Sequence, residues 1–268
     1  MTTYSVTHHH YPYNVFEKHF HTESTSQLSY GIIILNHARD SLDKLLTKPL
    51  WKNAKIRGCA DGGANMLKDF TFKLVNADEK NHFIPDYISG DMDSITSTTK
   101  NYYAKYNVQL IHTPDQNATD FTKCIQIMLE RSSLDVIYIF STFGGRFDQA
   151  MSIIHTLYLF PTIELYLVTD EDITFVLRPG YNHIHIKSPL RGEYCSLLPI
   201  AGPVTSVSTK GLKWNLDGNT TLDFHTLVSS SNAYDEELLK SDVADHVEVC
   251  TEKDLVWSMT YNVNLICA

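Results

Sequence analysis

The amino-acid sequence predicts an α/β protein with two domains: an N-terminal domain built on a mostly parallel α/β sheet, and a C-terminal antiparallel β-sandwich. From residue 30 onward, short apolar runs alternate with stretches of helical spacing, which is typical of parallel strands joined by helices. After about residue 168, apolar and polar positions alternate along the runs, and turn residues separate them. The length of 268 residues allows one large domain or two smaller ones.

In the first half, the candidate strands are wholly or largely apolar, as strands buried in a parallel sheet are. They lie at residues 32–35, 54–60, 87–89, 108–111, 136–140 and 163–168. Two stretches between them place apolar side chains on one helical face. These are Phe121, Ile125, Met128 and Leu129 in the first, and Phe147, Met151, Ile154 and Tyr158 in the second. We expect this α/β domain to span residues 29–172.

In the second half, residues 183–186 alternate strictly between histidine and isoleucine, as a half-buried strand does. Further strand-like runs occupy residues 194–198, 204–209, 212–216 and 255–261, with turn residues between them. We expect the β-sandwich domain to span residues 173–268. No carboxylate or cysteine recurs beside His183 and His185 at ligand spacing, so we expect both to be ordinary strand residues.

Residues 1–28 are rich in His, Tyr, Ser and Thr and show no clear periodicity. They include His8, His9, His10, His19 and His21. A histidine tract of this kind can bind a metal ion. We favour the simpler interpretation, a flexible or loosely docked N-terminal extension.

The balance of 22 basic and 31 acidic residues leaves a formal net charge of −9. This charge argues against nucleic-acid and anionic membrane partners, but a metal ion could still bridge carboxylates to a small anionic ligand. No apolar run is long enough for a membrane span, and the first residues lack the apolar core of a signal peptide. Five cysteines without a CxxC pair suggest a reducing compartment. We therefore expect a cytoplasmic protein.

Four polar motifs follow predicted strands, at the sheet edge where open α/β proteins bind ligands. In order they are Asp61-Gly62-Gly63-Ala64-Asn65, Gly90-Asp91-Met92-Asp93-Ser94, Asp115-Gln116-Asn117-Ala118-Thr119-Asp120, and Gly144-Gly145-Arg146-Phe147-Asp148. Each motif alone could be an ordinary turn, helix cap or solvated ion pair. Their placement at one edge favours a shared ligand site. The chain has no GxxxxGK[ST] loop, no GxGxxG motif after a strand and no GxSxG motif.

The chemistry of these motifs suits a metal ion and phosphate. Asp91 and Asp93, beside a glycine, offer the oxygen ligands that Mg²⁺ prefers. Thr119 and Asp120 open a predicted helix whose N-terminus favours phosphate, and Lys123 could add a positive charge. Arg146 could bind phosphate through two hydrogen bonds.

These motifs, in this order, resemble those of the thiamin pyrophosphokinase family. The resemblance covers roughly residues 30–262 and includes Gly211-Leu212-Lys213-Trp214-Asn215-Leu216 and Leu227-Val228-Ser229-Ser230-Ser231-Asn232. It implies an α/β catalytic domain that binds ATP and Mg²⁺, a β-sandwich that binds thiamine, and a homodimer with the active site at the interface. It also implies transfer of the terminal diphosphate of ATP to the hydroxyl of thiamine, with release of AMP.

The same resemblance assigns roles to individual residues. Asp91, Asp93 and Asp120 would hold Mg²⁺ and the phosphates, with Asp61 nearby, and these four are the expected catalytic residues. Gln116, Thr119 and Lys123 would contact the triphosphate, and Arg146 and Asp148 would complete the nucleotide side. Trp214 would stack on the thiamine rings, within its subunit or across the interface, and Ser231 and Asn232 would contact the aminopyrimidine. Which of Asp61, Asp91 and Asp120 acts as a base, or whether one is needed, stays open.

Two departures from the family pattern affect substrate binding more than the reaction class. Asn117 stands where many relatives have an acid, and Gln149 where many have histidine.

Two other functions remain compatible with the sequence. A metal-dependent phosphohydrolase would release inorganic phosphate without needing thiamine. A catalytically silent binding module would bind thiamine or nucleotide without turnover.

Overall fold

The computed structural model describes residues 6–17, 28–74, 82–237 and 245–262. The chain forms two compact units. One, here called the α/β unit, comprises His21–Asp170, and the other, the β unit, comprises Met1–Phe20 together with Glu171–Ala268. No helix of the described residues is both long and apolar enough to span a membrane.

The α/β unit is built on six parallel strands, as the alternation of apolar runs and helical stretches predicted. In sheet order they are β7 (Glu164–Val168), β6 (Val136–Phe140), β2 (Tyr30–Ile34), β3 (Ile56–Ala60), β4 (Tyr87–Gly90) and β5 (Gln109–His112). All residues of β2 and β6 are buried. The α/β fold class is therefore confirmed for this part of the chain.

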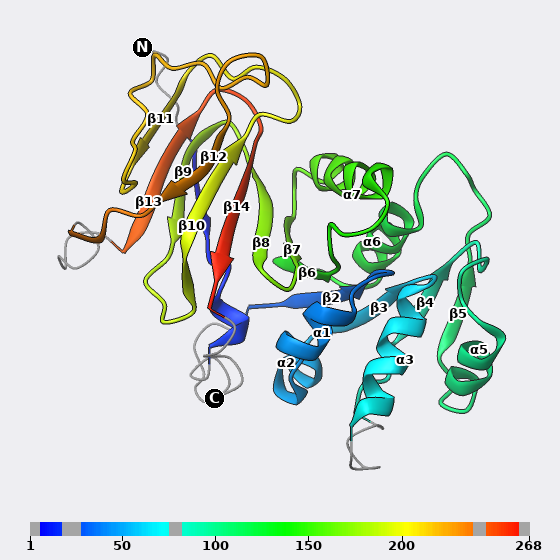
Figure 1. Cartoon of the computed structure of the whole chain (residues 1–268). Helices are drawn as coiled ribbons and strands as arrows, with labels where there is room; N and C mark the ends of the chain where they lie inside the picture. Colours follow the sequence, from blue (N-terminus) through cyan, green and yellow to red (C-terminus); the bar gives the residue numbers. More distant parts are fainter. Residues whose placement is uncertain (1–5, 18–27, 75–81, 238–244, 263–268) are drawn as a thin grey trace. The chain divides into compact units, whose positions relative to one another are not determined.

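Helices cover both faces of this sheet, which is why its central strands are apolar on both sides (Figure 1). On one face lie α1 (Arg39–Leu45), α2 (Lys48–Asn53), α3 (Gly63–Lys73) and α5 (Ser97–Ala104), and on the other α6 (Asp120–Arg131) and α7 (Phe147–Leu159). β5 lies at the edge of the sheet and is largely exposed, unlike the buried strand that its apolar residues predicted.

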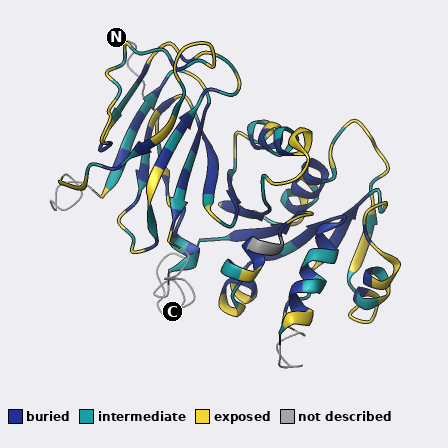
Figure 2. Ribbon diagram, in the orientation of Figure 1, coloured by how far each residue is buried: buried dark blue, intermediate teal, exposed yellow. Residues whose placement is uncertain are grey.

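The two helices predicted from apolar spacing are both present. The predicted buried face agrees with the structure in α6 but only in part in α7. In α6, Phe121, Ile125 and Met128 are buried as predicted. In α7, Phe147 is 74% exposed, and the buried face is centred on Ala150, Ile154 and Leu157 instead. Phe147 lies within the exposed stretch of residues 144–149, and Ala150 is the first buried residue of α7. Figure 2 shows which parts of the chain are buried and which are exposed.

The β unit contains the C-terminal β-rich domain that the sequence predicted. One of its sheets has the order β1-β9-β13-β11, and its other strands follow the order β12-β10-β14-β8 in antiparallel pairs. The bounds are β1 (Thr7–His10), β8 (Asp172–Leu177), β9 (Gly180–His185), β10 (Arg191–Leu198), β11 (Val207–Lys210), β12 (Ser229–Ala233), β13 (His246–Thr251) and β14 (Leu255–Tyr261).

The N-terminal segment is not a flexible extension where the structure describes it. β1 pairs in parallel with β9, and a short 3₁₀ turn, η1 (Asn14–Phe16), buries Val15 completely. Nε2 of His10 lies 3.0 Å from Oδ1 of Asn182, and both residues are fully buried. This part of the expectation for residues 1–28 is therefore wrong, because pairing and burial fix the segment. Residues 1–5 and 18–27 lie outside the described part of the chain.

Four other elements of the β unit differ from the prediction. β8, β12 and β13 were not predicted as strands, and residues 212–216 form a loop in which Leu212 makes an isolated bridge to Tyr234. The loop has a local cause. Gly211 has φ +92°, and the Asn215 side chain accepts a hydrogen bond from Leu212 N and donates one to Leu212 O. These bonds compete with strand pairing.

Candidate active site

Three carboxylates of the α/β unit meet at the carboxyl ends of its strands. Asp61 follows β3, Asp91 follows β4, and Asp120 opens α6. One oxygen from each lies within 4.8 Å of the others. These residues are far apart in sequence, and the parallel sheet brings them together at the edge where ligands bind in such folds.

The buried Asp61 side chain is fixed by the loop that follows β4. Its Oδ2 accepts a hydrogen bond from Ser94 N (2.9 Å), and its Oδ1 accepts one from Ile95 N (3.1 Å). The neighbouring Asn65 holds the same loop, because its Nδ2 donates to Ser94 O (2.9 Å). Burial raises the pKa of Asp61, and the side chains of Asp93 and Asp120 act in the same direction, against the two backbone hydrogen bonds.

Gly90 lets the three acids approach one another. Its φ is +156°, and a Cβ atom at this position would lie 2.7 Å from Cβ of Asp61 and 3.3 Å from Cγ of Asp120. Asp61 (φ +40°) and Met92 (φ +67°) also adopt the left-handed backbone conformation. Strain of this kind persists where the surrounding structure enforces it, which is common at binding sites.

Asp93 borders the carboxylate cluster, and its side chain interacts with both Asp61 and Asp91. Asp91 N donates to Oδ1 of Asp120 (3.2 Å), whereas Oδ1 of Asp91 accepts from Asp93 N (3.2 Å). The latter hydrogen bond lowers the pKa of Asp91. The carboxylate of Asp93 accepts the hydroxyl of Ser94 (2.8 Å). The resemblance implied a metal set of Asp91, Asp93 and Asp120. The structure brings Asp61 together with Asp91 and Asp120, and the role of Asp93 as a metal ligand stays a prediction.

A cavity of about 370 Å³ opens over the acids, between the strand ends and the starts of α6 and α7. The predicted residues that line it are Asp61, Asp91, Asp93, Thr119, Asp120 and Arg146. Sequence analysis missed Asn36, His37 and Thr142, which also line it. Each comes soon after the end of β2 or β6, so the strand-end argument that found the other motifs could have found them.

Three predicted residues of the α/β unit do not line this cavity. The buried Lys123 pairs with Asp120 Oδ1 (2.9 Å) and donates to Thr113 O and Asp115 O (2.8 and 2.9 Å). All three donors of its ammonium group are therefore used within the protein. Gln116 Nε2 lies 3.4 Å from Asp91 Oδ2. Asp148 forms an exposed ion pair with Arg146.

The start of α6 adds a second feature that suits an anion. Thr119 is its N-cap, with Oγ1 accepting a hydrogen bond from Thr122 N (3.1 Å), and Thr119 also lines the cavity. A helix N-terminus carries a partial positive charge and free N–H groups. Carboxylate oxygens, a helix N-terminus and Arg146 together suit a hard divalent cation bound to a phosphate.

The predicted thiamine-contacting residues lie in the β unit, and the structure brings two of them together. Trp214 is 56% exposed, with Lys213 Nζ 4.7 Å from its ring centroid. The buried Asn232 holds the Trp214 backbone, because Asn232 Oδ1 accepts from Trp214 N (3.3 Å) and Asn232 Nδ2 donates to Trp214 O (2.9 Å). Asn232 Oδ1 also accepts from Ala233 N (2.9 Å). Asn232 thus positions the tryptophan loop, and the neighbouring Ser231 is exposed.

Two family models match these two parts of the chain. The catalytic domain of thiamin pyrophosphokinase matches residues 47–167, and the vitamin B1 binding domain of the same enzyme matches residues 182–256. The chain belongs to the thiamin pyrophosphokinase family. The family's catalytic domain thus contains the carboxylate cluster, and its vitamin B1 binding domain contains Trp214 and Asn232.

Individual members of the thiamin pyrophosphokinase family resemble the chain over most of its length. Thiamine pyrophosphokinases 1 and 3 of Oryza sativa subsp. japonica are 34% and 35% identical to it, and each match covers 87% of both chains. The structure of thiamin pyrophosphokinase from Candida albicans matches with a TM-score of 0.77 and 26% identity, over 96% of this chain and 93% of that one.

Proposed function

We propose that this protein transfers the terminal diphosphate of ATP to the hydroxyl of thiamine, forming thiamine diphosphate and AMP in a Mg²⁺-dependent reaction. As a member of its family, the chain is an enzyme of the thiamine diphosphokinase class. The observation that carries the finer proposal is the grouping of Asp61, Asp91 and Asp120 in a cavity beside the N-terminus of α6. Metal-bound triphosphate needs this combination of groups.

The donor set fits magnesium, because the clustered side chains of Asp61, Asp91 and Asp120 offer only hard oxygen atoms. These three residues would hold the ion, and Asp93 would lie beside it. When bound, Mg²⁺ would neutralise charge on the phosphate oxygens and polarise the phosphorus that is attacked. Arg146 and the free N–H groups of α6 would bind further phosphate oxygens.

The remaining work of the protein would be positioning and proton transfer, as in phosphoryl transfer generally. Attack must fall on the β-phosphorus, so that AMP leaves. A carboxylate of the cluster would accept the proton of the thiamine hydroxyl if a base is required. Burial raises the pKa of Asp61, which makes its carboxylate one candidate for this base.

On the thiamine side, the exposed ring of Trp214 would stack on the cationic thiazolium. Lys213 would have to leave the Trp214 ring face that it occupies if thiamine uses that face. Asn232 would keep the tryptophan loop in place through its two hydrogen bonds to the Trp214 backbone, and Ser231 would be free to contact the aminopyrimidine.

Product analysis tests the reaction. Incubation with ATP, Mg²⁺ and thiamine should yield AMP and thiamine diphosphate in equal amounts. The variant Asp91→Asn should lose about 100-fold or more of this activity at saturating Mg²⁺. The control Glu130→Gln, on the exposed side of α6, should keep it. Inorganic phosphate released without thiamine would indicate a phosphohydrolase instead, and thiamine binding without turnover would indicate a silent binding module.

We also propose that the enzyme is a homodimer whose active site combines the carboxylates of one subunit with Trp214 of the other. A mixture of Trp214→Ala and Asp91→Asn chains, refolded together, tests this arrangement. Each mixed dimer would contain one site with both residues intact, so the mixture should recover about a quarter of the wild-type activity. If each subunit builds its own site, no activity will return.

A further inference from the structure

Four side chains with metal-binding atoms share the half-exposed face of the sheet formed by β9 and β13. His183 and His185 lie two residues apart on β9, and His246 and Glu248 lie two apart on β13. Side chains two residues apart point to the same face of a strand. The register pairs His246 with His185 and Glu248 with His183. The opposite face is buried and contains Ile184, Val247 and Val249.

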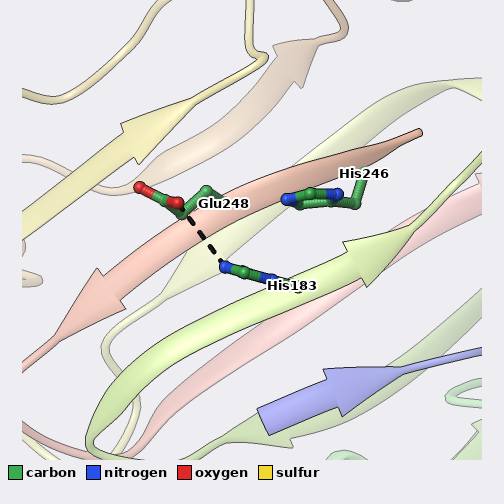
Figure 3. A group of neighbouring side chains, drawn as sticks. All are labelled: His183, His246 and Glu248. Carbon is green, nitrogen blue, oxygen red and sulfur yellow. Dashed lines mark ion pairs between the residues drawn. The ribbon is translucent and has the colours of Figure 1, made fainter. Parts of the chain in front are cut away.

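Three of these side chains converge, as Figure 3 shows. Nε2 of His183 lies 3.5 Å from Oε2 of Glu248, and the rings of His183 and His246 stack with centroids 4.3 Å apart. One ligand atom from each of His183, His246 and Glu248 lies within 4.8 Å of the others. These separations suit three ligands around one ion, since ligand atoms at about 2 Å from zinc lie roughly 3 to 4 Å apart.

The Asp245 carboxylate forms a hydrogen bond with one member of this group, His246. Nδ1 of His246 lies 2.8 Å from Oδ1 of Asp245, which leaves Nε2 of His246 as the nitrogen for an ion. Metal-binding histidines commonly use their second nitrogen in this way, because the carboxylate fixes the ring and makes it a better ligand.

We propose that His183, His246 and Glu248 form a binding site for a divalent transition-metal ion of the zinc type, with Asp245 as the positioning residue for His246. Two imidazoles and one carboxylate suit such ions, whereas the all-oxygen cluster of the α/β unit suits Mg²⁺. The site is independent of the proposed reaction. A bound ion would link β9 to β13 across the sheet.

The electrostatic setting favours neutral imidazoles, the form that binds metals. Burial lowers the pKa of His183, and His246 and His9 lower it further, against the opposing effect of Glu248. The side chains of His183, His246 and Glu248 are 22%, 27% and 37% exposed, so an ion could reach them from solvent. Burial likewise lowers the pKa of His185, and Asp245 raises it.

β1 adds a histidine to the same surface. His9 pairs with His183 in the register of β1 and β9, and Nδ1 of His9 lies 3.2 Å from Nε2 of His185. A second triplet, His185, Asp245 and His246, shares His246 with the first. We assign the ion to the first triplet, since that arrangement keeps Asp245 as the partner of His246.

Metal titration of the full chain tests the proposal. Zn²⁺ is added in the presence of excess Mg²⁺, which occupies the carboxylate cluster, and binding is measured by competition with a chromophoric chelator. We expect one tight ion per chain. The double variant His183→Gln, His246→Gln should bind it at least about 100-fold more weakly, and Asp245→Asn about 10- to 100-fold more weakly. His225→Gln, an exposed histidine of the same unit outside the cluster, should bind normally.

Two further measurements keep the outcome interpretable. Thermal unfolding with EDTA shows whether the variants fold, and added Zn²⁺ should raise the unfolding temperature of the wild type but not of the double variant. Unchanged affinity in the double variant would overturn the site. So would equal losses in the double variant and His225→Gln, or a tight ion that disappears in Asp91→Asn instead.

Discussion

At the scale of single residues, Gly90 shows how one missing side chain shapes the site. Its backbone lies against Asp61 and Asp120. These two acids must lie close together if they are to bind the same ion. Any Cβ atom at position 90 would collide with Asp61 and would also face the cost of a positive φ. The glycine is therefore part of the site although it offers no ligand atom.

We expect Gly90→Ala to lower the free energy of unfolding by about 1–3 kcal/mol and to abolish most activity, because the carboxylates must move apart. Denaturant titration and product assays measure the two effects. Gly145→Ala is the control, since Gly145 also has positive φ (+88°), but a Cβ atom there would meet no described atom within 4 Å. If both variants lose the same stability, the positive φ rather than the collision with Asp61 is the cause of the loss.

His183 and His185 predict how stability depends on pH. Both have a pKa lowered mainly by burial, so below the ordinary histidine pKa of 6.5 the unfolded chain binds more protons than the folded one. Stability should therefore fall as pH drops below 6.5. With EDTA present, the variant His183→Gln, His185→Gln should lose less stability between pH 7 and pH 5.5 than the wild type. An equal loss of unfolding free energy in the variant and the wild type over this pH range would contradict the prediction.

At the scale of elements, the start of α6 combines helix stability with the candidate site. Thr119 caps the helix through Oγ1, and Asp120 supplies a carboxylate to the cluster in the next position. The cap therefore determines where the first turn of α6 begins and where the Asp120 side chain lies.

We expect Thr119→Ala to lower the free energy of unfolding by about 1 kcal/mol and to reduce activity, because the first turn of α6 loses its cap. Thr119→Ser keeps the hydroxyl and should restore both, as measured by denaturant titration and product formation. If serine fails to restore activity, the threonine methyl group rather than the cap is what matters.

β1 joins the β unit through a buried polar pair rather than through apolar contacts alone. We expect His10→Ala to cost about 1–3 kcal/mol, because Asn182 Oδ1 loses the buried partner that lies 3.0 Å away. The melting temperature should fall by about 2–4 °C for each kcal/mol lost. His8→Ala removes a half-buried neighbour on the same strand and should change it much less. Equal melting temperatures for the two variants would mean that β1 docks without this pair.

At the scale of the whole molecule, the two units should respond to different ligands. Amide hydrogen exchange with Mg²⁺ and ATP should slow around Asp61, residues 90–95 and the start of α6. Exchange with thiamine should slow in residues 211–216 and in β12, where Asn232 holds the tryptophan loop. Stronger protection of the α/β unit than of residues 211–216 by thiamine alone would contradict the proposed division of substrates.

The α/β unit was predictable from the sequence to a large extent. Strands that are buried on both faces must be apolar along their whole length, so β2 and β6 stand out without any knowledge of their neighbours. The strand ends then locate the polar motifs at one edge. The exposed Phe147 marks the limit of this argument, since periodicity identifies a helix but not which of its turns other elements cover.

The β unit was less predictable, because its strands depend on partners distant in the chain. β12 has the sequence Ser-Ser-Ser-Asn-Ala, which has low strand propensity and forms a strand only beside β10. Residues 212–216 show the opposite case, in which hydrogen bonds of the Asn215 side chain accompany a loop where alternating apolar residues predicted a strand. The role of Asn232 as the support of that loop likewise follows from contacts between separate segments.

The sequence by itself determined the fold class, the family and the acidic and glycine-rich motifs, because apolar periodicity and ordered motifs are local properties of the chain. Only the tertiary structure decided which side chains share a site. Asp61 joins Asp91 and Asp120 through the parallel sheet, and Asp93 borders them. His183 has no carboxylate beside it in sequence, yet β13 brings Glu248 opposite it. A metal ligand set is a statement about distances in space, and strand pairing sets those distances between residues far apart in the chain.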